Sequence, residues 1–169
     1  MTDAAAQSSG RPQWRVFLGL AGAVAIVDQV TKDWLRSLLE PRQSVEVFGD
    51  WVRLVHAQNA GGLFGLFQGQ VSVFALVSIV VVGLLIAYHA RAGDSRYTSI
   101  TLGLLLGGAI GNLTDRLRLG YVVDFVDLGI GDLRWYTFNV ADAAISFSLL
   151  LLIAASIWPQ LTRRAPGDA

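Results

Sequence analysis

Residues 111–142 read GNLTDRLRLGYVVDFVDLGIGDLRWYTFNVAD and carry the two aspartates, Asp124 and Asp142, that decide how the chain must fold. Asp142 stands near the start of a long apolar run, where an ionisable side chain is costly and therefore a functional-site candidate. On one straight helix the two aspartates, 18 positions apart, would be separated by roughly 27 Å. They can meet only if the chain reverses, and Gly129 and Gly131 allow a reversal because glycine tolerates positive φ. We predict that Asp124 and Asp142 meet as a catalytic pair.

A pair of carboxylates in one site has a specific chemical use. Two such groups do not ionise together easily, so one holds a proton while the other stays charged. The charged one can take a proton from water while the neutral one donates to a carbonyl oxygen, which hydrolyses a peptide without a covalent intermediate. The alternative is that each carboxylate only caps a helix, since Asp142 falls in the first turn of its apolar run, where negative charge suits the helix dipole.

The composition places the chain among membrane proteins. Hydrophobic residues make up 53% and charged residues 15% of the 169 positions. The sequence contains no cysteine, which excludes disulfides, thiol nucleophiles and cysteine-ligated metals. The net charge is zero, so nothing points to a nucleic-acid partner. No metal or organic cofactor is implied.

Four apolar segments approach the roughly 20 residues that span a bilayer. We predict an all-α membrane protein with four transmembrane helices and a small extracytoplasmic β element. The first segment has a cleavable signal peptide as its alternative, but no small-residue cleavage pattern follows it. The predicted organisation is a disordered cytoplasmic tail at 1–13, one membrane domain at 14–160 with spans at about 16–35, 71–90, 97–113 and 138–158, and a cytoplasmic tail at 161–169.

The extracytoplasmic element is predicted at 40–67. Residues 44–48 and 51–55 are β-branched, partly alternating runs separated by Gly49 and Asp50, which predicts two short strands joined by a turn. A glycine-rich apolar stretch then leads into the second span. Within the third span, Gly103, Gly107 and Gly111 recur every four residues, which predicts a helix face for close packing against a neighbour.

Four spans put both termini on one membrane side. The short segments on that side are rich in arginine, which favours a cytoplasmic location for both termini. The strands and both aspartates then face outward. The arginines in these short segments are Arg11, Arg15, Arg91, Arg96, Arg163 and Arg164.

Five short motifs together resemble the ordered motif set of the lipoprotein signal peptidases, the signal peptidase II family. The resemblance covers residues from about 16 to 160. The motifs are Asp28-Gln-x-Thr-Lys32, Asn59-x-Gly61-x-x-Phe64, Gly108-x-x-Gly111-Asn112-x-x-Asp115-Arg116, Gly120-x-Val122-x-Asp124-Phe125 and Phe138-Asn139-x-Ala141-Asp142. This chain departs from the family pattern at Gly62 and Leu63, which puts the stiffness of that loop in question.

The resemblance implies an aspartyl endopeptidase of the bacterial inner membrane that cuts prolipoproteins just before a diacylglyceryl-modified cysteine. By motif match, Asp124 and Asp142 take the catalytic places. We expect diacylated prolipoproteins as substrates, membrane lipid as surroundings and a monomeric enzyme. The remaining motif positions supply the candidate substrate-binding or supporting residues: Asp28, Lys32, Asn59, Gly61, Gly108, Asn112, Arg116, Asn139 and Ala141.

Several of these residues keep structural alternatives. Asp28 and Lys32 are four apart and predict an intrahelical ion pair, which either eases charge into lipid or supports the site. Asn112 and Asn139 either orient a carboxylate or substrate, or complete a helix end. Asn59 is either a turn residue or a substrate contact.

Asp115 and Arg116 read as a structural ion pair, with Arg116 alternatively holding a lipid phosphate or the substrate backbone. His56 and His89 have no partner at ligand spacing, and we expect both on the surface.

Two other functional classes fit weaker signals. A proton-coupled transporter would place acids near mid-bilayer on several helices, and a non-catalytic assembly factor would use the glycine face.

Overall fold

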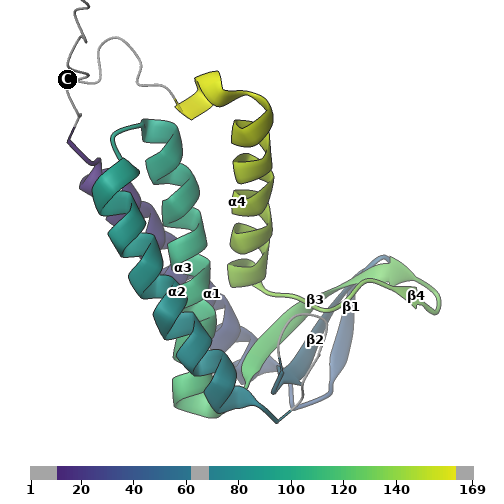
Figure 1. The fold of residues 1–169 in the computed structure, drawn as a ribbon. Coiled ribbons are helices and arrows are strands. Elements are labelled where there is room, and N and C mark those ends of the chain that lie inside the picture. The colour runs from purple at the N-terminus through teal and green to yellow at the C-terminus, as the bar shows by residue number, and fades with distance from the viewer. Residues whose placement is uncertain (1–10, 62–68, 163–169) are drawn as a thin grey trace, which may run out of the picture.

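The computed structural model describes residues 11–61 and 69–162 of the chain. Four helices lie side by side, and a small antiparallel sheet projects sideways at one end of them (Figure 1). The helices are α1 (Trp14–Leu38), α2 (Val71–Ala92), α3 (Arg96–Leu119) and α4 (Val140–Ile157). The strands are β1 (Ser44–Phe48), β2 (Val52–Asn59), β3 (Val122–Ile130) and β4 (Leu133–Arg134), and a 3-10 turn, η2 (Pro159–Thr162), follows α4.

Helix α3 is the central helix, and its glycines allow the others to approach. A Cβ at Gly103 would lie 2.8 Å from the carbonyl oxygen of Phe17 in α1, and one at Gly107 would lie 2.7 Å from that of Ala21. Gly108 faces the other way, where a Cβ would lie 2.5 Å from the carbonyl oxygen of Ala141 in α4. The predicted close-packing face is confirmed by Gly103 and Gly107 against α1, and Gly108, which was not predicted as part of it, lets α4 approach the other side of α3.

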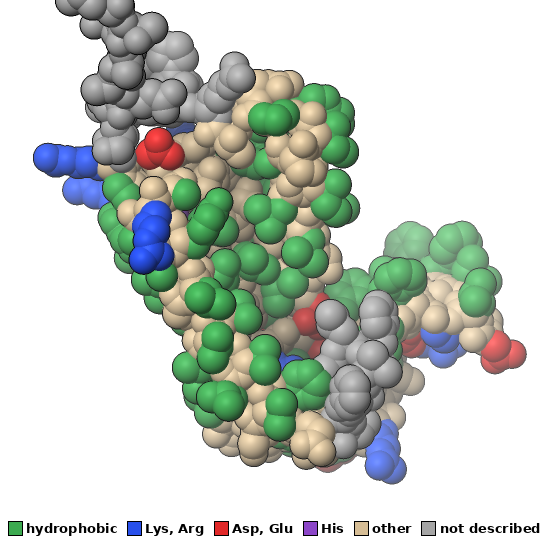
Figure 2. All heavy atoms as spheres, viewed as in Figure 1, with side chains coloured by type: hydrophobic (Ala, Val, Ile, Leu, Met, Phe, Trp, Pro, Cys, Tyr) green, Lys and Arg blue, Asp and Glu red, His purple; other side chains and the backbone are tan. Residues whose placement is uncertain are grey.

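Three helices of the described chain, α1, α2 and α4, are long and apolar enough to cross a membrane. Figure 2 shows apolar side chains spread over the visible face of α2 and α4, and α1 also exposes apolar side chains, including Ile26 and Val30. The fourth predicted span, 97–113, lies in α3, a helix of 24 residues that continues to Leu119 and does not meet the same test. The prediction ended this helix too early because its last turns are polar.

The predicted hairpin of β1 and β2 is confirmed, with Val45 opposite Leu54. The stretch carrying Asp124 was expected only to reverse, and the structure makes it a third strand, β3, paired with β2 through Ala57 and Asp124. The reversal itself comes at the β3–β4 turn, where Gly131 has a φ of 56°. A strand was missed because Val122–Ile130 carries two aspartates and a glycine.

The two ends of the helix group differ. Helix α1 begins and α4 ends at the end opposite the sheet (Figure 1). There the backbone N–H of Gln13 donates to the carbonyl of Gly93, 2.8 Å away, and joins α1 to the turn between α2 and α3.

His89 lies at that same end, and its predicted surface location is wrong. Its ring is fully buried, stacks on Phe17 with centroids 4.0 Å apart and lies 3.0 Å from the Ser99 hydroxyl. Ser99 in turn donates to the carbonyl of Gly93, 3.0 Å away. We call Phe17, His89, Gly93 and Ser99 the histidine cluster.

His56 is also buried, on β2, with its Nδ1 2.8 Å from the carbonyl oxygen of Leu39. Each histidine stands alone in the sequence, so nothing there signalled its burial.

Candidate active site

The site lies at the sheet end of the helices and begins with a buried ion pair on α1. Lys32 Nζ lies 2.7 Å from Asp28 Oδ2, so the predicted intrahelical pair is confirmed. The same ammonium lies 3.0 Å from Asp115 Oδ2 and donates to Asn112 Oδ1, 3.0 Å away, both on α3. Lys32 and Asp28 are 1% and 0% exposed. This burial favours a role inside the site rather than at a lipid surface.

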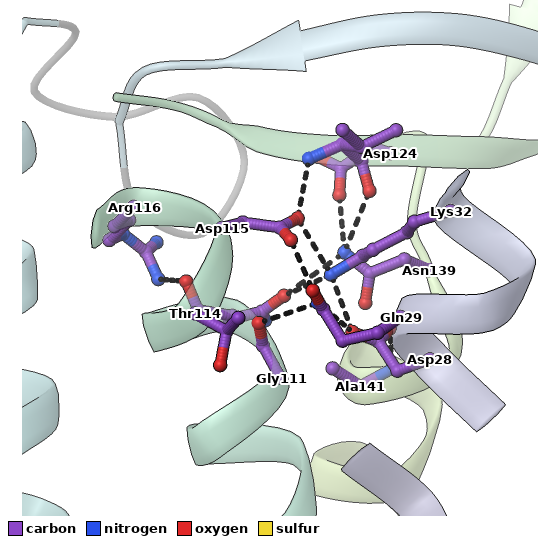
Figure 3. Close-up of polar contacts among 12 residues, drawn as sticks. Asp28, Gln29, Lys32, Gly111, Thr114, Asp115, Arg116, Asp124, Asn139 and Ala141 are labelled. Atoms are coloured by element: carbon purple, nitrogen blue, oxygen red, sulfur yellow. Dashed lines mark hydrogen bonds and ion pairs between the residues drawn. The ribbon is translucent and has the colours of Figure 1, made fainter. Parts of the chain in front are cut away.

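Asp115 connects α3 to the sheet. Its Oδ2 accepts the backbone N–H of Val123, 3.0 Å away, and its Oδ1 accepts from Gln29 Nε2 at 2.8 Å (Figure 3). The predicted ion pair between Asp115 and Arg116 is wrong: the cation that Asp115 holds is Lys32. Neighbouring residues on a helix point in different directions, and a pair needs a spacing of three or four.

Arg116 points instead toward the chain that follows β2. Its guanidinium donates to the carbonyl oxygens of Asn112 and Gly61, each at 3.2 Å, and lies 5.6 Å from the ring centroid of Phe74. Gly61 is also held by its own N–H, which donates to Asn59 Oδ1 at 3.0 Å. Gly62 and Leu63, where the chain departs from the motif, and Phe64, which matches it, lie outside the described residues.

The first turn of α4 carries Asp142. Asn139 is the N-cap, and it forms a capping box: its Oδ1 accepts the N–H of Asp142 at 2.9 Å, and Asp142 Oδ2 accepts the N–H of Asn139 at 3.3 Å. The N–H of Ala141 donates to Asp28 Oδ1 at 2.9 Å, so α1 also caps this helix. Asn, with Asp three residues on, is a sequence signature of a helix start.

Asparagine side chains join the two carboxylates. Asn139 Nδ2 donates to Asp124 Oδ1 at 2.7 Å, and Asn112 Nδ2 donates to Asp142 Oδ1 at 2.7 Å. The two amides also meet, with Asn139 Nδ2 3.2 Å from Asn112 Oδ1. From β2, Asn59 Nδ2 donates to Asp124 Oδ2 at 3.1 Å. The structure therefore brings Asp124 and Asp142 into one hydrogen-bonded group, which we call the carboxylate cluster: Asp28, Lys32, Asn59, Asn112, Asp115, Asp124, Asn139 and Asp142.

The electrostatics of Asp124 are those of a buried acid. Burial and the neighbouring negative charge of Asp142 raise the pKa of the Asp124 carboxyl from 3.8 to about 7, against the hydrogen bonds from Asn59 and Asn139. Burial and both aspartates also raise the pKa of the nearby Tyr136 phenol. The arrangement can thus hold one proton on a carboxyl group near neutral pH, as acid–base hydrolysis requires.

The structure places the other predicted site residues in or beside this cluster. Gly108 and Ala141 serve the close packing of α3 and α4. Two neighbours were not singled out from the sequence. Gln29 is a position of the motif Asp28-Gln-x-Thr-Lys32, which was its signal, and Tyr136 lies two positions before a recognised motif, so proximity was its only signal. Among residues 11–61 and 69–162, no group of three His, Cys, Asp or Glu side chains is arranged to hold a metal.

Comparisons with known proteins point to one family. A family model described as signal peptidase (SPase) II matches residues 20–158. The lipoprotein signal peptidase of Moorella thermoacetica is 42% identical over 137 residues, covering 80% of this chain and 89% of that protein. That of Methylobacterium sp. strain 4-46 is 40% identical over 161 residues, covering 91% and 94%.

Solved structures agree with the fold. A bacterial membrane enzyme determined by the in meso method at 2.3 Å superimposes with a TM-score of 0.82 at 26% identity, covering 92% of this chain and 95% of that one. A second such enzyme, determined at 1.9 Å, gives 0.79 at 28% identity, covering 88% and 97%.

Proposed function

The chain belongs to the signal peptidase II family, and on that premise we propose that it is an aspartyl endopeptidase of the bacterial inner membrane. It removes signal peptides from diacylglyceryl-modified prolipoproteins by cutting just before the lipidated cysteine. The observation that carries the proposal is the carboxylate cluster, in which Asn112 and Asn139 join two buried aspartates. Buried carboxylates share protons, and shared protons serve acid–base chemistry.

The reaction proceeds in two balanced steps. In the first, the ionised carboxylate takes a proton from a water molecule, whose oxygen bonds to the scissile carbonyl carbon. The protonated carboxyl group gives its proton to the carbonyl oxygen, and a neutral gem-diol forms. In the second, the carboxyl group that gained a proton gives it to the amide nitrogen and the C–N bond breaks. The other carboxylate takes a proton from a gem-diol hydroxyl, so the pair again holds one proton.

The other residues of the cluster position this pair. Asp28 and Asp142 both hold the first turn of α4, so the catalytic carboxylate is attached to a rigid helix start. Asp115 fixes β3 at Val123, next to Asp124. Arg116 and Asn59 both hydrogen-bond with the backbone of Gly61, and they are the groups that substrate backbone would meet there. Preorganised positioning of this kind supplies much of the rate of an enzyme.

We place the protein in the membrane with α3 as a fourth span. At about 1.5 Å per residue, its 24 residues reach roughly 36 Å, more than the ~30 Å hydrocarbon core. A helix surrounded by α1, α2 and α4 has no need of an apolar surface, because its neighbours rather than lipid cover it. Four spans put both termini in the cytoplasm, with the sheet and the carboxylate cluster at the outer face.

This placement matches the chemistry of the substrate. Two acyl chains anchored in the outer leaflet hold the modified cysteine at the membrane surface, at the depth of the cluster. The sheet supports the same depth, since exposed apolar side chains line its outer part, with Leu133 83% and Phe48 75% exposed. Apolar and aromatic side chains of this kind favour the membrane–water interface.

The activity is tested by incubating the purified protein in lipid with a diacylated precursor peptide and with the same peptide lacking the lipid. We expect cleavage of the diacylated peptide immediately before the modified cysteine, and little cleavage of its unmodified twin. Equal cleavage of both peptides would contradict a lipid-directed site, and cleavage of neither would contradict the proposed function.

The topology is tested with single cysteines, which are unambiguous because the chain has none of its own. An impermeant thiol reagent should label Gln43→Cys and Asp132→Cys in intact spheroplasts and should not label Asp94→Cys. The opposite labelling pattern would invert the arrangement and place the cluster on the wrong side for exported substrates.

A further inference from the structure

We propose that the two aspartates have fixed and different roles: Asp142 is the ionised carboxylate that takes the proton from water, and Asp124 carries the proton that is donated to the carbonyl oxygen. This assignment rests on the proposed peptidase function, since it divides that reaction between the two groups. It follows from two differences between the surroundings of the two side chains.

The first difference is the element on which each side chain stands. Asp142 is the third residue of α4 and the acidic partner of its capping box. Negative charge in the first turn of a helix is stabilised by the partial positive charge of that end, by about 0.3–1 kcal/mol at exposed sites and up to ~2 when partly buried. Asp124 stands on β3, and strands have only small net dipoles. The fold therefore favours the negative charge on Asp142.

The second difference is a relay from Lys32 to Asp142. The ammonium of Lys32 can only donate, and it donates to Asn112 Oδ1 at 3.0 Å. Asn139 Nδ2 donates to the same oxygen at 3.2 Å. With its oxygen held by two donors, the amide of Asn112 must present Nδ2 to Asp142 Oδ1, 2.7 Å away. Asn139 donates to Asp124 at the same distance, but its own oxygen is held by a backbone N–H and not by a cation. The donor that the Lys32 ammonium polarises favours the ionised form of Asp142 more strongly.

The hydrogen bonds from the described residues to the four carboxylate oxygens are alike: Asp142 accepts bonds of 2.7 and 3.3 Å, and Asp124 accepts bonds of 2.7 and 3.1 Å. The assignment therefore rests on the helix start and on the relay from Lys32. The raised pKa of Asp124, about 7, agrees with it.

The other charged or titratable groups around the pair are engaged in contacts of their own. Lys32 is paired with Asp28 and Asp115, at 2.7 and 3.0 Å, and Arg116 donates to two backbone carbonyls. Tyr136 faces both aspartates and is neutral at physiological pH, because its pKa is raised above 10.0. No group of this set supplies Asp124 with the cation that would make it the ionised partner.

Two matched variants separate this assignment from its reverse. Asn112→Ala removes the side-chain donor to Asp142, and Asn59→Ala removes the longer donor to Asp124. If Asp142 is the base, Asn112→Ala moves the acid limb of the kcat/KM profile to higher pH, by about one unit. Asn59→Ala then moves the alkaline limb to higher pH and leaves the acid limb in place. If the two variants exchange these effects, the assignment is overturned.

A spectroscopic measurement tests the assignment without catalysis. Infrared spectra report protonated carboxyl groups by their C=O stretch. The spectra are recorded on the full chain in lipid at about pH 6, roughly one unit below the pKa of Asp124. We expect that Asp124→Asn removes this band and that Asp142→Asn keeps it. Loss of the band only in Asp142→Asn would overturn the proposal. If the protein cleaved no diacylated peptide, the proposed function would fail while the infrared result still reported where the proton resides.

Discussion

The two ends of the helix group each bury polar side chains, and they do so differently. The histidine cluster joins α1, α2 and α3 through one ring, one hydroxyl and one carbonyl group, and aromatic stacking on Phe17 covers the ring. The carboxylate cluster, with Arg116 beside it, gathers four aspartates around two cations: Asp28, Asp115, Asp124 and Asp142 around Lys32 and Arg116.

The difference shows which kind of buried polarity indicates chemistry. The His89 ring contacts Ser99 through Nε2, while its buried Nδ1 has no partner among the described residues, and the cluster brings no like charges together. A surplus of carboxylates over cations cannot be neutralised by packing, so it must hold a proton. Such an arrangement lowers stability and persists where function requires it. Like charge brought together, rather than burial alone, distinguishes the candidate active site from the structural end.

The largest effect on stability is expected at Lys32. Lys32→Met leaves Asp28 and Asp115 buried without their cation, which costs about 3–5 kcal/mol of unfolding free energy. The control is Arg36→Met on the same helix, since Arg36 is 32% exposed and pairs with Asp33, a surface pair worth about 0–1 kcal/mol. Thermal unfolding in detergent measures both. Equal stability of the two variants would show that the carboxylate cluster does not depend on its central charge.

Alanine variants at two glycines of the same α3 face should distinguish the functional end of the helix group from the structural end. A Cβ at Gly111 would lie 2.6 Å from Asp28 Oδ2, and one at Gly103 would lie 2.8 Å from the carbonyl oxygen of Phe17. Each alanine variant should lose about 1–3 kcal/mol through overpacking. Only Gly111→Ala should also lose turnover, by roughly a hundredfold, because it displaces a side chain of the site.

The control for this pair is Gly83→Ala, because nothing lies within 4 Å of a Cβ there. That variant should keep both its stability and its turnover. Equal loss of turnover in the Gly103 and Gly111 variants, measured per folded molecule, would contradict the division between the two ends.

A smaller effect is expected at the histidine cluster itself. His89→Leu removes the contact with Ser99 and the stacking on Phe17, at a cost of about 1–2 kcal/mol. Turnover of the folded protein should not change, because the ring is far along α2 from the carboxylates. Tyr88→Leu, at a position 56% exposed, is the matched control for general effects on α2. Loss of turnover in a fully folded His89→Leu protein would mean that this end also serves the reaction.

The smallest effect is a pH dependence of stability at Asp124. Its pKa is raised from 3.8 to about 7 on folding, so folding favours the protonated form and stability falls as pH rises through that interval. Asp124→Asn cannot ionise and should gain stability relative to the original chain between about pH 4 and pH 8. We expect about 1 kcal/mol, since the amide also weakens the bonds from Asn139 and Asn59. Melting temperatures of both proteins at several pH values measure the gain. A gain of Asp124→Asn that appears only at low pH would contradict the raised pKa of Asp124.

Much of this arrangement could be predicted from the sequence. Hydrophobic length placed the helices, the β-branched runs placed β1 and β2, and the spacing of Gly103, Gly107 and Gly111 indicated the face toward α1. Asp28 and Lys32 were identified as a pair because a spacing of four is a local property of a helix. These features depend on neighbours in the chain.

The rest depends on contacts between distant segments. The partner of Asp115 is Lys32, 83 positions away in the chain, so adjacency to Arg116 was misleading. The burial of His89 depends on the way in which α1 crosses it, and β3 formed because β2 and Phe138 supplied its hydrogen-bonding partners. Such contacts leave no periodic signal in a single sequence.

The central claim is that Asp124 and Asp142 act as one catalytic unit. The most direct test is turnover of a diacylated precursor peptide by Asp124→Asn, Asp142→Asn and the double variant, each at verified folded concentration. The account predicts that each single variant abolishes cleavage and that the double variant is no worse than either, because removing one half of the proton exchange already stops it. Near-normal turnover in either folded single variant would contradict the account.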